Sequence, residues 1–252
     1  MGRVLFTLFL AVVLGSPANA AVFGLDDRTF ARTDPPSPYS PIGLVEGFGQ
    51  YTTGTLVNRC DVLTAQHLAR RTSDPIGERV SFYGALGSSH RLSSEGTIIA
   101  TGGFVRQKVR TPQSYDNVGS DWMVVRLDEC LGDKLGWARL VSQRPADGTI
   151  PTHLQDAGFP TDRPRSQGLT VDPDCAIKVV APMVLFHDCA SLHGNSGGPI
   201  FRLVNVDGVQ RMEVFGITTA VFTLGRSEVP TRGEENVATP TWNVTYADAD
   251  RW

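Results

Sequence analysis

Short runs of β-branched, aromatic and other apolar residues recur along the chain from Ile42 onwards, and glycine and proline separate them. The spacing of these turn residues suits hairpins, and helical periodicity is nearly absent. The sequence therefore predicts an all-β protein. We expect strands at residues 52–57, 61–65, 80–83, 96–100 and 123–127, and a second set at residues 153–158, 169–171, 176–180, 200–204, 212–221 and 241–246.

Two segments that lack this pattern mark the limits of the expected folded parts. Residues 128–148 are rich in charged residues and glycine, which indicates a crossing between two subdomains. Before residue 40 the chain is polar and interrupted by Pro35, Pro36 and Pro38, so regular structure is expected only afterwards. We interpret residues 21–40 as an N-terminal arm or a propeptide, and residues 41–252 as the folded domain.

The first 20 residues are typical of an export signal. Arg3 precedes an apolar run at residues 4–14, and the small residues Ala18 and Ala20 follow. The apolar run is too short to span a bilayer, and no later segment reaches spanning length. We expect cleavage after Ala20 and a secreted or periplasmic protein without a membrane anchor.

The chain is mildly acidic. Removing the signal takes the formal net charge from -3 to -4, because Arg3 is the one charged residue of that segment. No block of like charges and no run of Lys and Arg is present. The charge pattern therefore does not favour binding to nucleic acid or to anionic membranes. A protein or peptide partner is compatible with this composition, and we expect a monomer.

The four cysteines, Cys60, Cys130, Cys175 and Cys189, are widely spaced and form no C-x-x-C motif. This spacing disfavours a zinc ribbon or a redox dithiol. In an exported protein an even number of cysteines indicates disulfides, and three pairings are possible. We favour Cys60 with Cys130 and Cys175 with Cys189, because the second pair closes a short, hairpin-sized loop.

The segment Gly194-Asn195-Ser196-Gly197-Gly198-Pro199 places a serine among glycines. A serine is a poor nucleophile unless a base removes its proton, and the base must be held in the right tautomer. The glycines let the backbone turn sharply, so that the N–H groups of Gly194 and Ser196 can point at a developing oxyanion. We therefore predict Ser196 as a nucleophile, with Gly194 and Ser196 as oxyanion donors.

The order of residues along the chain decides which serine-nucleophile fold fits. The same segment matches G-x-S-x-G, the turn of α/β-hydrolases, but those enzymes carry a histidine after the serine. The last histidine of this chain is His193, which precedes Ser196. A subtilisin-type nucleophile opens a helix, which Gly197, Gly198 and Pro199 disfavour. The order His, Asp, Ser remains.

His67 is the strongest candidate for the base among the five histidines. It ends the apolar run Val62-Leu63-Thr64-Ala65-Gln66, and a strand end is where a rigid scaffold can present a catalytic side chain. His90 lies in a polar loop, His153 in an expected strand, and His187 beside an expected disulfide. We interpret these three as structural or solvated.

Asp121 is the candidate for the acid that orients the base. It directly precedes the apolar run Trp122-Met123-Val124-Val125, so its carboxylate is expected at the mouth of a buried strand. Asp116, the main alternative, lies in a loop. An aspartate before a strand is often only a turn residue, and the position of Asp121 between His67 and Ser196 is what favours catalysis.

The motifs L-T-A-x-H, D-W-x-V-V-R-L and G-N-S-G-G-P, in this order, resemble those of the chymotrypsin (trypsin-like) family of serine proteases. The resemblance extends over residues 42–246. It implies two six-stranded antiparallel β-barrels, at residues 41–130 and 131–252, with the triad His67, Asp121 and Ser196 in the cleft between them. It also implies a serine endopeptidase that works through an acyl-enzyme and needs no cofactor.

Within that family the chain is similar to the bacterial glutamyl-endopeptidase-like branch. Asn195 stands where trypsin-like zymogens carry an aspartate that pairs with the newly cut N-terminus, so activation through that ion pair is not expected. Leu68 stands where those enzymes usually carry a disulfide cysteine. Residues 22–28 are similar to the mature N-terminal segment of the branch, where the arm helps to form the substrate pocket.

The same resemblance assigns the primary substrate pocket to Ala190 and Ser191 at the base and to Thr218, Thr219 and Ala220 along one wall. We interpret His193 either as a residue at the rim of this pocket or as a solvent-exposed loop histidine. No acid is present there, so a preference for Lys or Arg is not expected. A glutamyl preference in the branch depends on a histidine after Gly-Ile, and Thr218 stands in its place. A polar substrate side chain and a small apolar one fit equally well.

His187, Asp188, Cys189 and His193 also suggest a metal site, but a disulfide would consume Cys189 and no ligand spacing is recognisable. We predict no metal.

Two alternatives to a constitutively active protease are compatible with the sequence. One is a binding protein that uses the fold without catalysis, although no triad member is missing here. The other is a protease kept latent by residues 21–40.

Overall fold

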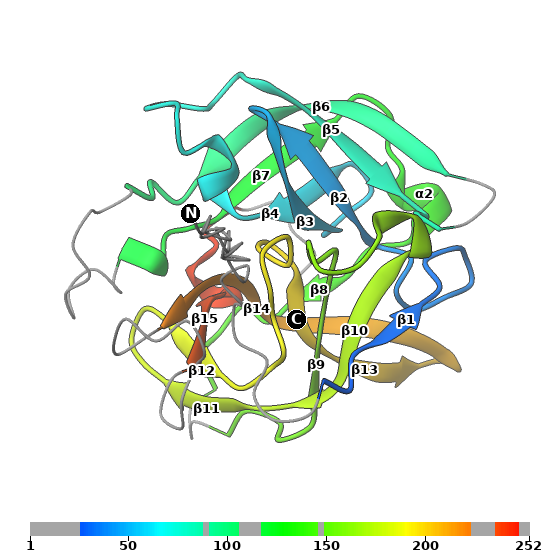
Figure 1. Cartoon of the computed structure of the whole chain (residues 1–252), viewed down its shortest axis with the longest axis vertical. Helices are drawn as coiled ribbons and strands as arrows, with labels where there is room; N and C mark the ends of the chain where they lie inside the picture. The colour runs from blue at the N-terminus through cyan, green and yellow to red at the C-terminus, as the bar shows by residue number, and fades with distance from the viewer. Residues whose placement is uncertain (1–25, 88–90, 106–116, 146–148, 223–234, 247–252) are drawn as a thin grey trace, which may run out of the picture.

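The computed structural model describes residues 26–87, 91–105, 117–145, 149–222 and 235–246. Two β-structures make up this part of the chain, one above the other in Figure 1. The upper one comes from the first half of the chain, and the lower one from the second half together with one N-terminal strand. The expected all-β, two-part architecture is confirmed.

The first β-structure is a closed barrel. Its strands are β2 (Ile42–Gly47), β3 (Gln50–Leu56), β4 (Asp61–Thr64), β5 (Arg79–Gly84), β6 (Leu92–Thr101) and β7 (Met123–Leu127). They pair antiparallel in the order β2-β3-β4-β7-β6-β5, and β5 returns to β2. Val45, Phe82, Ile98 and Met123 fill its interior and are fully buried. Closure pairs both sides of each strand, which leaves the barrel without a free edge.

The second β-structure is a curled, open sheet. Its strands are β1 (Thr29–Ala31), β8 (Arg139–Leu140), β9 (Leu154–Gly158), β10 (Leu169–Cys175), β11 (Ile177–Val180), β12 (Leu185–His187), β13 (Pro199–Val206), β14 (Val209–Phe222) and β15 (Glu235–Pro240). Their order is β1-β10-β9-β13-β14-β15-β12-β11, and β8 pairs with β14 beside this path. Within the described residues the sheet has nine strands, whereas a closed barrel of six strands was expected. The chain runs from β10 through Ala176 into β11, so it connects the strand next to β1 with the last strand at the other end of the sheet.

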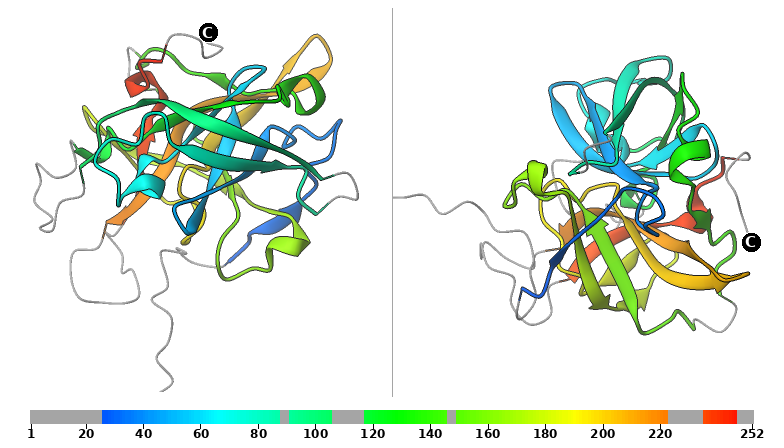
Figure 2. Two further views of the ribbon diagram at one scale, coloured as in Figure 1. Left: turned by 90° about the horizontal axis from the view of Figure 1, so that it is seen from above. Right: turned by 90° about the vertical axis from the view of Figure 1, so that its right-hand side faces the viewer.

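The N-terminal strand β1, dark blue in Figure 2, belongs to this second sheet because it pairs with β10. Arg28 lies just before β1 and is buried, and its guanidinium binds Asp26 at 2.8 Å and Asp162 at 2.7 Å. The expectation that regular structure begins only after residue 40 is therefore wrong. The ladder and the two ion pairs hold the arm on the sheet, and the prolines follow the strand rather than interrupt it. The expected signal at residues 1–20 lies outside the described residues.

The helical elements of the described residues are short, and they include η1 (Gln66–Ala69), α2 (Gly132–Leu135), η2 (Arg165–Gln167) and η3 (Thr241–Asn243). The prediction of a strand at residues 241–246 is wrong, because β15 ends at Pro240 and η3 follows it. The Thr241 hydroxyl bonds the carbonyls of Val141 at 2.8 Å and Val214 at 2.9 Å. Such bonds from a side chain to the backbone compete with a strand ladder. No helix in the described part of the chain is both long enough and apolar enough to cross a membrane.

The barrel and the open sheet share one hydrophobic core. Its fully buried members include Ile42 from the barrel and Phe201 and Ile217 from the open sheet.

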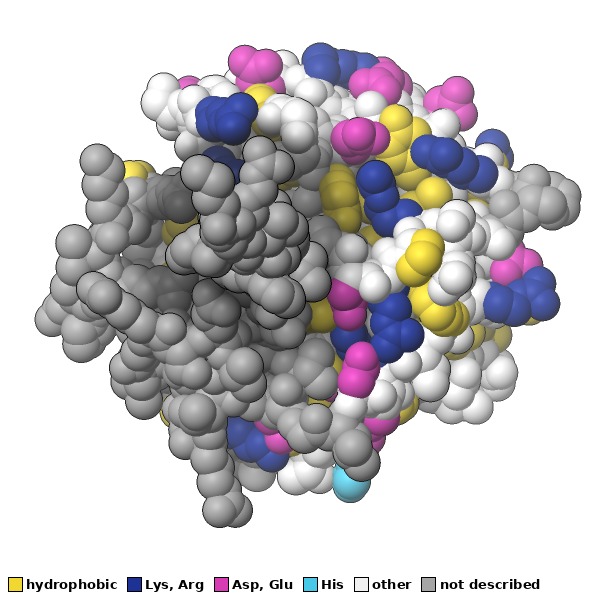
Figure 3. Space-filling view, in the orientation of Figure 1, with side chains coloured by type: hydrophobic (Ala, Val, Ile, Leu, Met, Phe, Trp, Pro, Cys, Tyr) yellow, Lys and Arg dark blue, Asp and Glu magenta, His cyan; other side chains and the backbone are white. Residues whose placement is uncertain are grey.

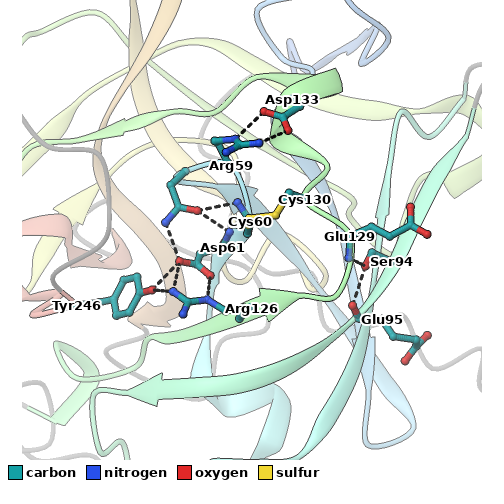
Figure 4. Close-up of a disulfide and its surroundings, with 11 residues drawn as sticks. Arg59, Cys60, Asp61, Ser94, Glu95, Arg126, Glu129, Cys130, Asp133 and Tyr246 are labelled. Carbon is teal, nitrogen blue, oxygen red and sulfur yellow. Dashed lines mark hydrogen bonds and ion pairs between the residues drawn. A yellow bond between two sulfur atoms is a disulfide. The ribbon is translucent and has the colours of Figure 1, made fainter.

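Two disulfides add covalent links, Cys60 to Cys130 in the barrel half (Figure 4) and Cys175 to Cys189 in the second half. This is the pairing favoured from the sequence.

Candidate active site

Ser196 lies in a tight turn just before β13. The N–H of Asn195 donates to the carbonyl of Leu192 at 2.9 Å, and the N–H of Gly198 donates to the carbonyl of Asn195 at 2.6 Å. The N–H of Gly197 donates to the carbonyl of Thr218 in β14 at 2.7 Å, so the turn is also fixed from outside. These bonds hold the backbone on both sides of Ser196.

Two of the glycines in this turn are required by geometry. Gly194 has φ +99° and Gly197 has φ +80°, a region that residues with a side chain rarely adopt. A Cβ at Gly194 would lie 2.2 Å from the carbonyl oxygen of Phe159, and a Cβ at Gly197 would lie 2.2 Å from that of Thr53. Because backbone atoms make these contacts, the neighbouring side chains cannot relieve them by rotating.

His67 and Asp121 are joined by two hydrogen bonds. Asp121 precedes β7 and is 2% exposed, and His67 lies in η1, directly after β4. The Asp121 carboxylate accepts the His67 backbone N–H at 2.8 Å through Oδ1, and Oδ2 lies 2.7 Å from the ring Nδ1. One carboxylate therefore fixes both the backbone and the ring of His67.

Thr53 in β3 connects the barrel to the turn that carries Ser196. Its backbone N–H donates to the Ser196 carbonyl at 2.8 Å, and its hydroxyl donates to the Gly194 carbonyl at 2.7 Å. The same hydroxyl accepts the backbone N–H of Phe159 at 3.0 Å. Thr53 thus holds the turn on both sides of Ser196, from the barrel that also carries His67.

The close approach of Gly197 to the barrel places the serine turn beside the His67 segment. A Cβ at Gly197 would lie 2.7 Å from the backbone nitrogen of Ala65, two residues before His67. The structure therefore brings the segments of all three predicted triad residues together at the junction of the barrel and the open sheet. Asp116, the alternative acid, lies outside the described residues.

The residues predicted for the substrate pocket precede or face this turn. Ala190 and Ser191 are buried before the turn, and Thr218 and Thr219 are buried in β14. The Thr219 hydroxyl donates to the Val237 carbonyl at 3.2 Å. His193 is exposed, and Ala220 lies in β14 with a side chain outside the described set. None of the four described pocket side chains at positions 190, 191, 218 and 219 is charged.

Asp156 in β9 is a buried acid that was not predicted from the sequence. It is 1% exposed, its Oδ1 accepts the Thr218 hydroxyl at 2.8 Å, and its Oδ2 accepts the Asn195 side-chain amide at 3.0 Å. Burial raises the pKa of Asp156 to about 7, although the hydrogen bonds from Thr218 and Asn195 oppose this increase. Nearby Asp172 raises the same pKa further, and Arg28 lowers it.

Asp172 in β10 is a second buried acid, and it lies directly opposite Asp156 in the β9–β10 ladder. Its carboxylate accepts the backbone N–H of Ala190 at 2.6 Å and that of Asp174 at 3.2 Å. Burial raises the pKa of Asp172 above its ordinary value. The sequence offers one signal for Asp156, which is its spacing of two residues from Leu154 and from Gly158. This spacing places Asp156 on the same, buried face of β9 as these two residues.

The remaining histidines are placed differently from one another. His187 in β12 is fully buried, and among the described residues neither of its ring nitrogens has a hydrogen-bond partner. Burial lowers the pKa of His187 to about 3, which Asp188 partly opposes. His153 is exposed beside Asp174, just before β9 rather than in it, and His90 lies outside the described residues. In the described ranges no three His, Cys, Asp or Glu side chains are grouped so as to hold a metal ion.

Comparisons with known proteins identify the family and the fold. The sequence model of the family described as Trypsin matches residues 36–246. The structure of a Glu endopeptidase in complex with MPD is similar with a TM-score of 0.63 and 19% identity, over 88% of this chain and 94% of that chain. Neuropsin, a serine protease expressed in the limbic system of mouse brain, is similar with a TM-score of 0.52 and 18% identity, over 83% of this chain and 93% of that chain. No curated protein matches.

The two structural similarities show the fold alone at these identities. That fold is the chymotrypsin fold expected from the sequence motifs. Leu68, where trypsin-like enzymes usually carry a cysteine, is fully buried in the barrel core.

Proposed function

Because this chain belongs to the trypsin family of serine proteases, we propose that it is an exported serine endopeptidase that cleaves peptide bonds through an acyl-enzyme. The observation that supports this most strongly is the double hydrogen bond of Asp121 to His67, at 2.8 and 2.7 Å. Such a contact orients a general base, as a serine nucleophile requires.

In this proposal Asp121 keeps the proton of His67 on Nδ1, because an ionised carboxylate can only accept hydrogen bonds. Nε2 is then the basic nitrogen that removes the Ser196 hydroxyl proton as Oγ attacks the substrate carbonyl. The N–H groups of Gly194 and Ser196 stabilise the oxyanion that forms. His67 next returns its proton to the leaving amine, and water hydrolyses the ester by the same route in reverse.

We propose that the pocket formed by Ala190, Ser191, Thr218, Thr219 and Ala220, with His193 at its rim, receives an uncharged substrate side chain. The hydroxyl protons of Thr218 and Thr219 are directed to Asp156 and to the Val237 carbonyl. They are therefore not offered to a substrate carboxylate, which disfavours a glutamyl preference. A Lys or Arg preference lacks the buried acid in the pocket that it would need.

We propose that residues from Asp26 onwards stay in the mature enzyme as an arm. The burial of Arg28 between Asp26 and Asp162 and the pairing of β1 with β10 support this, because removal of the arm would break both. A propeptide, if one is cleaved after the signal, then ends before Asp26. N-terminal sequencing of the secreted, active protein tests this proposal, and a mature start beyond Asp26 contradicts it.

The surface supports a peptide or protein substrate rather than a nucleic acid. On the face seen in Figure 3, Lys and Arg side chains alternate with Asp and Glu over the described area, so no field of one sign extends across it. Nucleic-acid binding needs an extended basic patch. We propose that the enzyme acts as a monomer, without a cofactor and without a membrane anchor.

A fluorophosphonate probe tests the nucleophile. We expect the wild type to be labelled at Ser196 and to hydrolyse casein, and Ser196→Ala to do neither. Asp121→Asn should keep the fold and lose about three to four orders of magnitude in kcat, because the amide no longer enforces the right tautomer of His67. A labelled residue other than Ser196, or a processed wild type that hydrolyses nothing, would contradict the proposal and favour a binding protein.

A further inference from the structure

The segment at residues 190–196 leads into the serine turn, and two buried carboxylates hold its two ends. Asp172 binds the first residue through the Ala190 N–H at 2.6 Å. Asp156 binds the penultimate residue through the Asn195 side chain at 3.0 Å. The two acids are opposite each other on β10 and β9, so one rigid ladder carries both contacts.

Asp156 also couples the turn to the strand behind it. Its second oxygen accepts the Thr218 hydroxyl at 2.8 Å, while the Thr218 carbonyl accepts the Gly197 N–H at 2.7 Å. Asp156, Asn195, Gly197 and Thr218 therefore form a closed circuit of contacts around Ser196. All four residues are buried, so solvent does not compete for these bonds.

Asn195 makes this internal support necessary. A neutral amide cannot form an ion pair with the N-terminus, so the turn needs another fixed partner. The Asn195 side chain donates to Asp156 instead, and a Cβ at Gly158 would lie 2.8 Å from the Asn195 side-chain carbon Cγ. The neighbouring strand β9 thus leaves room for Asn195 and also supplies its acceptor.

We propose that Asp156 and Asp172 are positioning residues that hold residues 190–196 in the catalytic conformation from within the second sheet, in place of an ion pair to the N-terminus. This inference rests on the proposed peptidase function. Neither acid touches the substrate. Asp156 acts through Asn195 and Thr218, and Asp172 acts through the backbone of Ala190.

The charge of Asp156 should affect activity, because hydrogen bonds to an ionised acceptor are stronger than those to a neutral one. The charged groups that act on Asp156 are Asp172 on β10, which disfavours its ionisation, and Arg28 on the arm, which favours it. Thr218 and Asn195 bind it from β14 and from the turn, and both are neutral. The wild type should therefore need two deprotonations for full activity, of His67 and of Asp156.

The decisive experiment compares Asp156→Ala, Asp156→Asn and Asp172→Asn with Asp61→Asn. Asp61 is a matched control, a buried acid in the barrel that binds Arg126 and Tyr246, far along the chain from the serine turn (Figure 4). For each variant we would measure the rate of fluorophosphonate labelling of Ser196, kcat and KM for a peptide substrate, and the melting temperature.

We expect Asp156→Ala to lower kcat by about 10- to 100-fold with little change in KM. Complete loss of one oxyanion donor lowers kcat by about 100- to 1,000-fold, and this substitution displaces such a donor without removing it. Asp156→Asn, which keeps the shape, should lose about tenfold and should show a lower limb of the pH profile with the slope of one proton instead of two. Asp172→Asn should also lower kcat. Asp61→Asn should lose stability and keep the wild-type kcat.

A double-mutant cycle tests whether Asp156 acts through Asn195. If it does, Asp156→Asn combined with Asn195→Ala should be no slower than the slower single variant. Additive losses, a kcat of both Asp156 variants within about twofold of Asp61→Asn, or an unchanged pH profile would each overturn the inference while leaving the peptidase function intact. A wild type that is not labelled at Ser196 would overturn the peptidase function and this inference together.

Discussion

Thr53 and Ser196 belong to different halves of the molecule, and the backbone N–H of Thr53 donates to the carbonyl of Ser196 at 2.8 Å. A nucleophile on one half and a base on the other work together only if the two halves keep a fixed spacing. Thr53 fixes this spacing, because its hydroxyl also donates to the Gly194 carbonyl and accepts the Phe159 N–H.

Thr53→Val should impair both stability and activity. The change keeps the shape but removes the hydroxyl that serves the Gly194 carbonyl and the Phe159 N–H, and one unsatisfied buried group costs about 1–3 kcal/mol. We expect a lower free energy of unfolding in urea and a kcat/KM reduced about tenfold or more. Thr53→Ser is the control, because it retains the hydroxyl. Equal losses in both variants would show that the methyl group matters and not the hydrogen bonds.

Gly197→Ala should abolish activity, whereas Gly208→Ala should not. Both glycines have positive φ, +80° and +81°, so an alanine meets similar backbone strain of about 1–2 kcal/mol at each. Only at Gly197 would the new Cβ also collide with the backbone, 2.2 Å from the Thr53 oxygen, while nothing lies within 4 Å at Gly208. Active-site labelling and melting temperatures of the two variants measure the difference. An active Gly197→Ala enzyme is the contrary result.

His187 should make the protein unstable in acid. Its pKa is about 3 in the folded protein and about 6.5 in the unfolded chain, so the unfolded chain binds the proton more tightly. The stability that this group contributes is fully present above pH 6.5 and is lost as the pH falls from 6.5 towards 3. Urea unfolding of the wild type between pH 7 and pH 4 should show this loss.

His187→Leu should remove that component of the acid instability, since leucine does not titrate. His153→Gln is the control, because His153 is exposed and should contribute little. If His187→Leu and the wild type lose stability in parallel over this range, carboxylates dominate the acid unfolding and the assignment to His187 is wrong.

The two disulfides should differ in what their removal affects. Cys60 and Cys130 are 70 residues apart and Cys175 and Cys189 are 14 apart, so loss of the first should cost about 1.4 kcal/mol more through chain entropy. Cys189 directly precedes residues 190–196, so its loss should lower kcat as well. Paired alanine variants, compared by unfolding and by turnover, separate these effects. A larger loss of kcat for the Cys60–Cys130 pair would contradict this expectation.

Much of the fold could be predicted from local sequence patterns. The strands near residues 61–65, 123–127 and 200–204 were predicted because apolar runs bounded by turn residues reflect a strand packed on a core. The segments bearing His67, Asp121 and Ser196 were found by their motifs and order. Strand β1 was missed because its stability depends on β10 and on the pair Arg28 and Asp162, which are 134 residues apart.

The supporting residues of the site could not be found in the same way. Asp156 is identifiable as important only once Asn195 and Thr218, 39 and 62 residues away, are seen to bind it. Thr53 is one of several threonines in an ordinary β-rich run, and its importance comes from contact with the other half. Interactions between strands that are distant in sequence leave no local signal that identifies the partners.

The arm strand β1 has a consequence for solubility. It covers one edge of β10, a strand of seven residues whose N–H and C=O groups would otherwise face outward on that side. Unpaired strand edges are templates on which other chains add, and natural proteins cover or interrupt them for that reason. A chain shortened to begin after Ala31 would offer this edge to its own copies, so the arm protects the protease against aggregation.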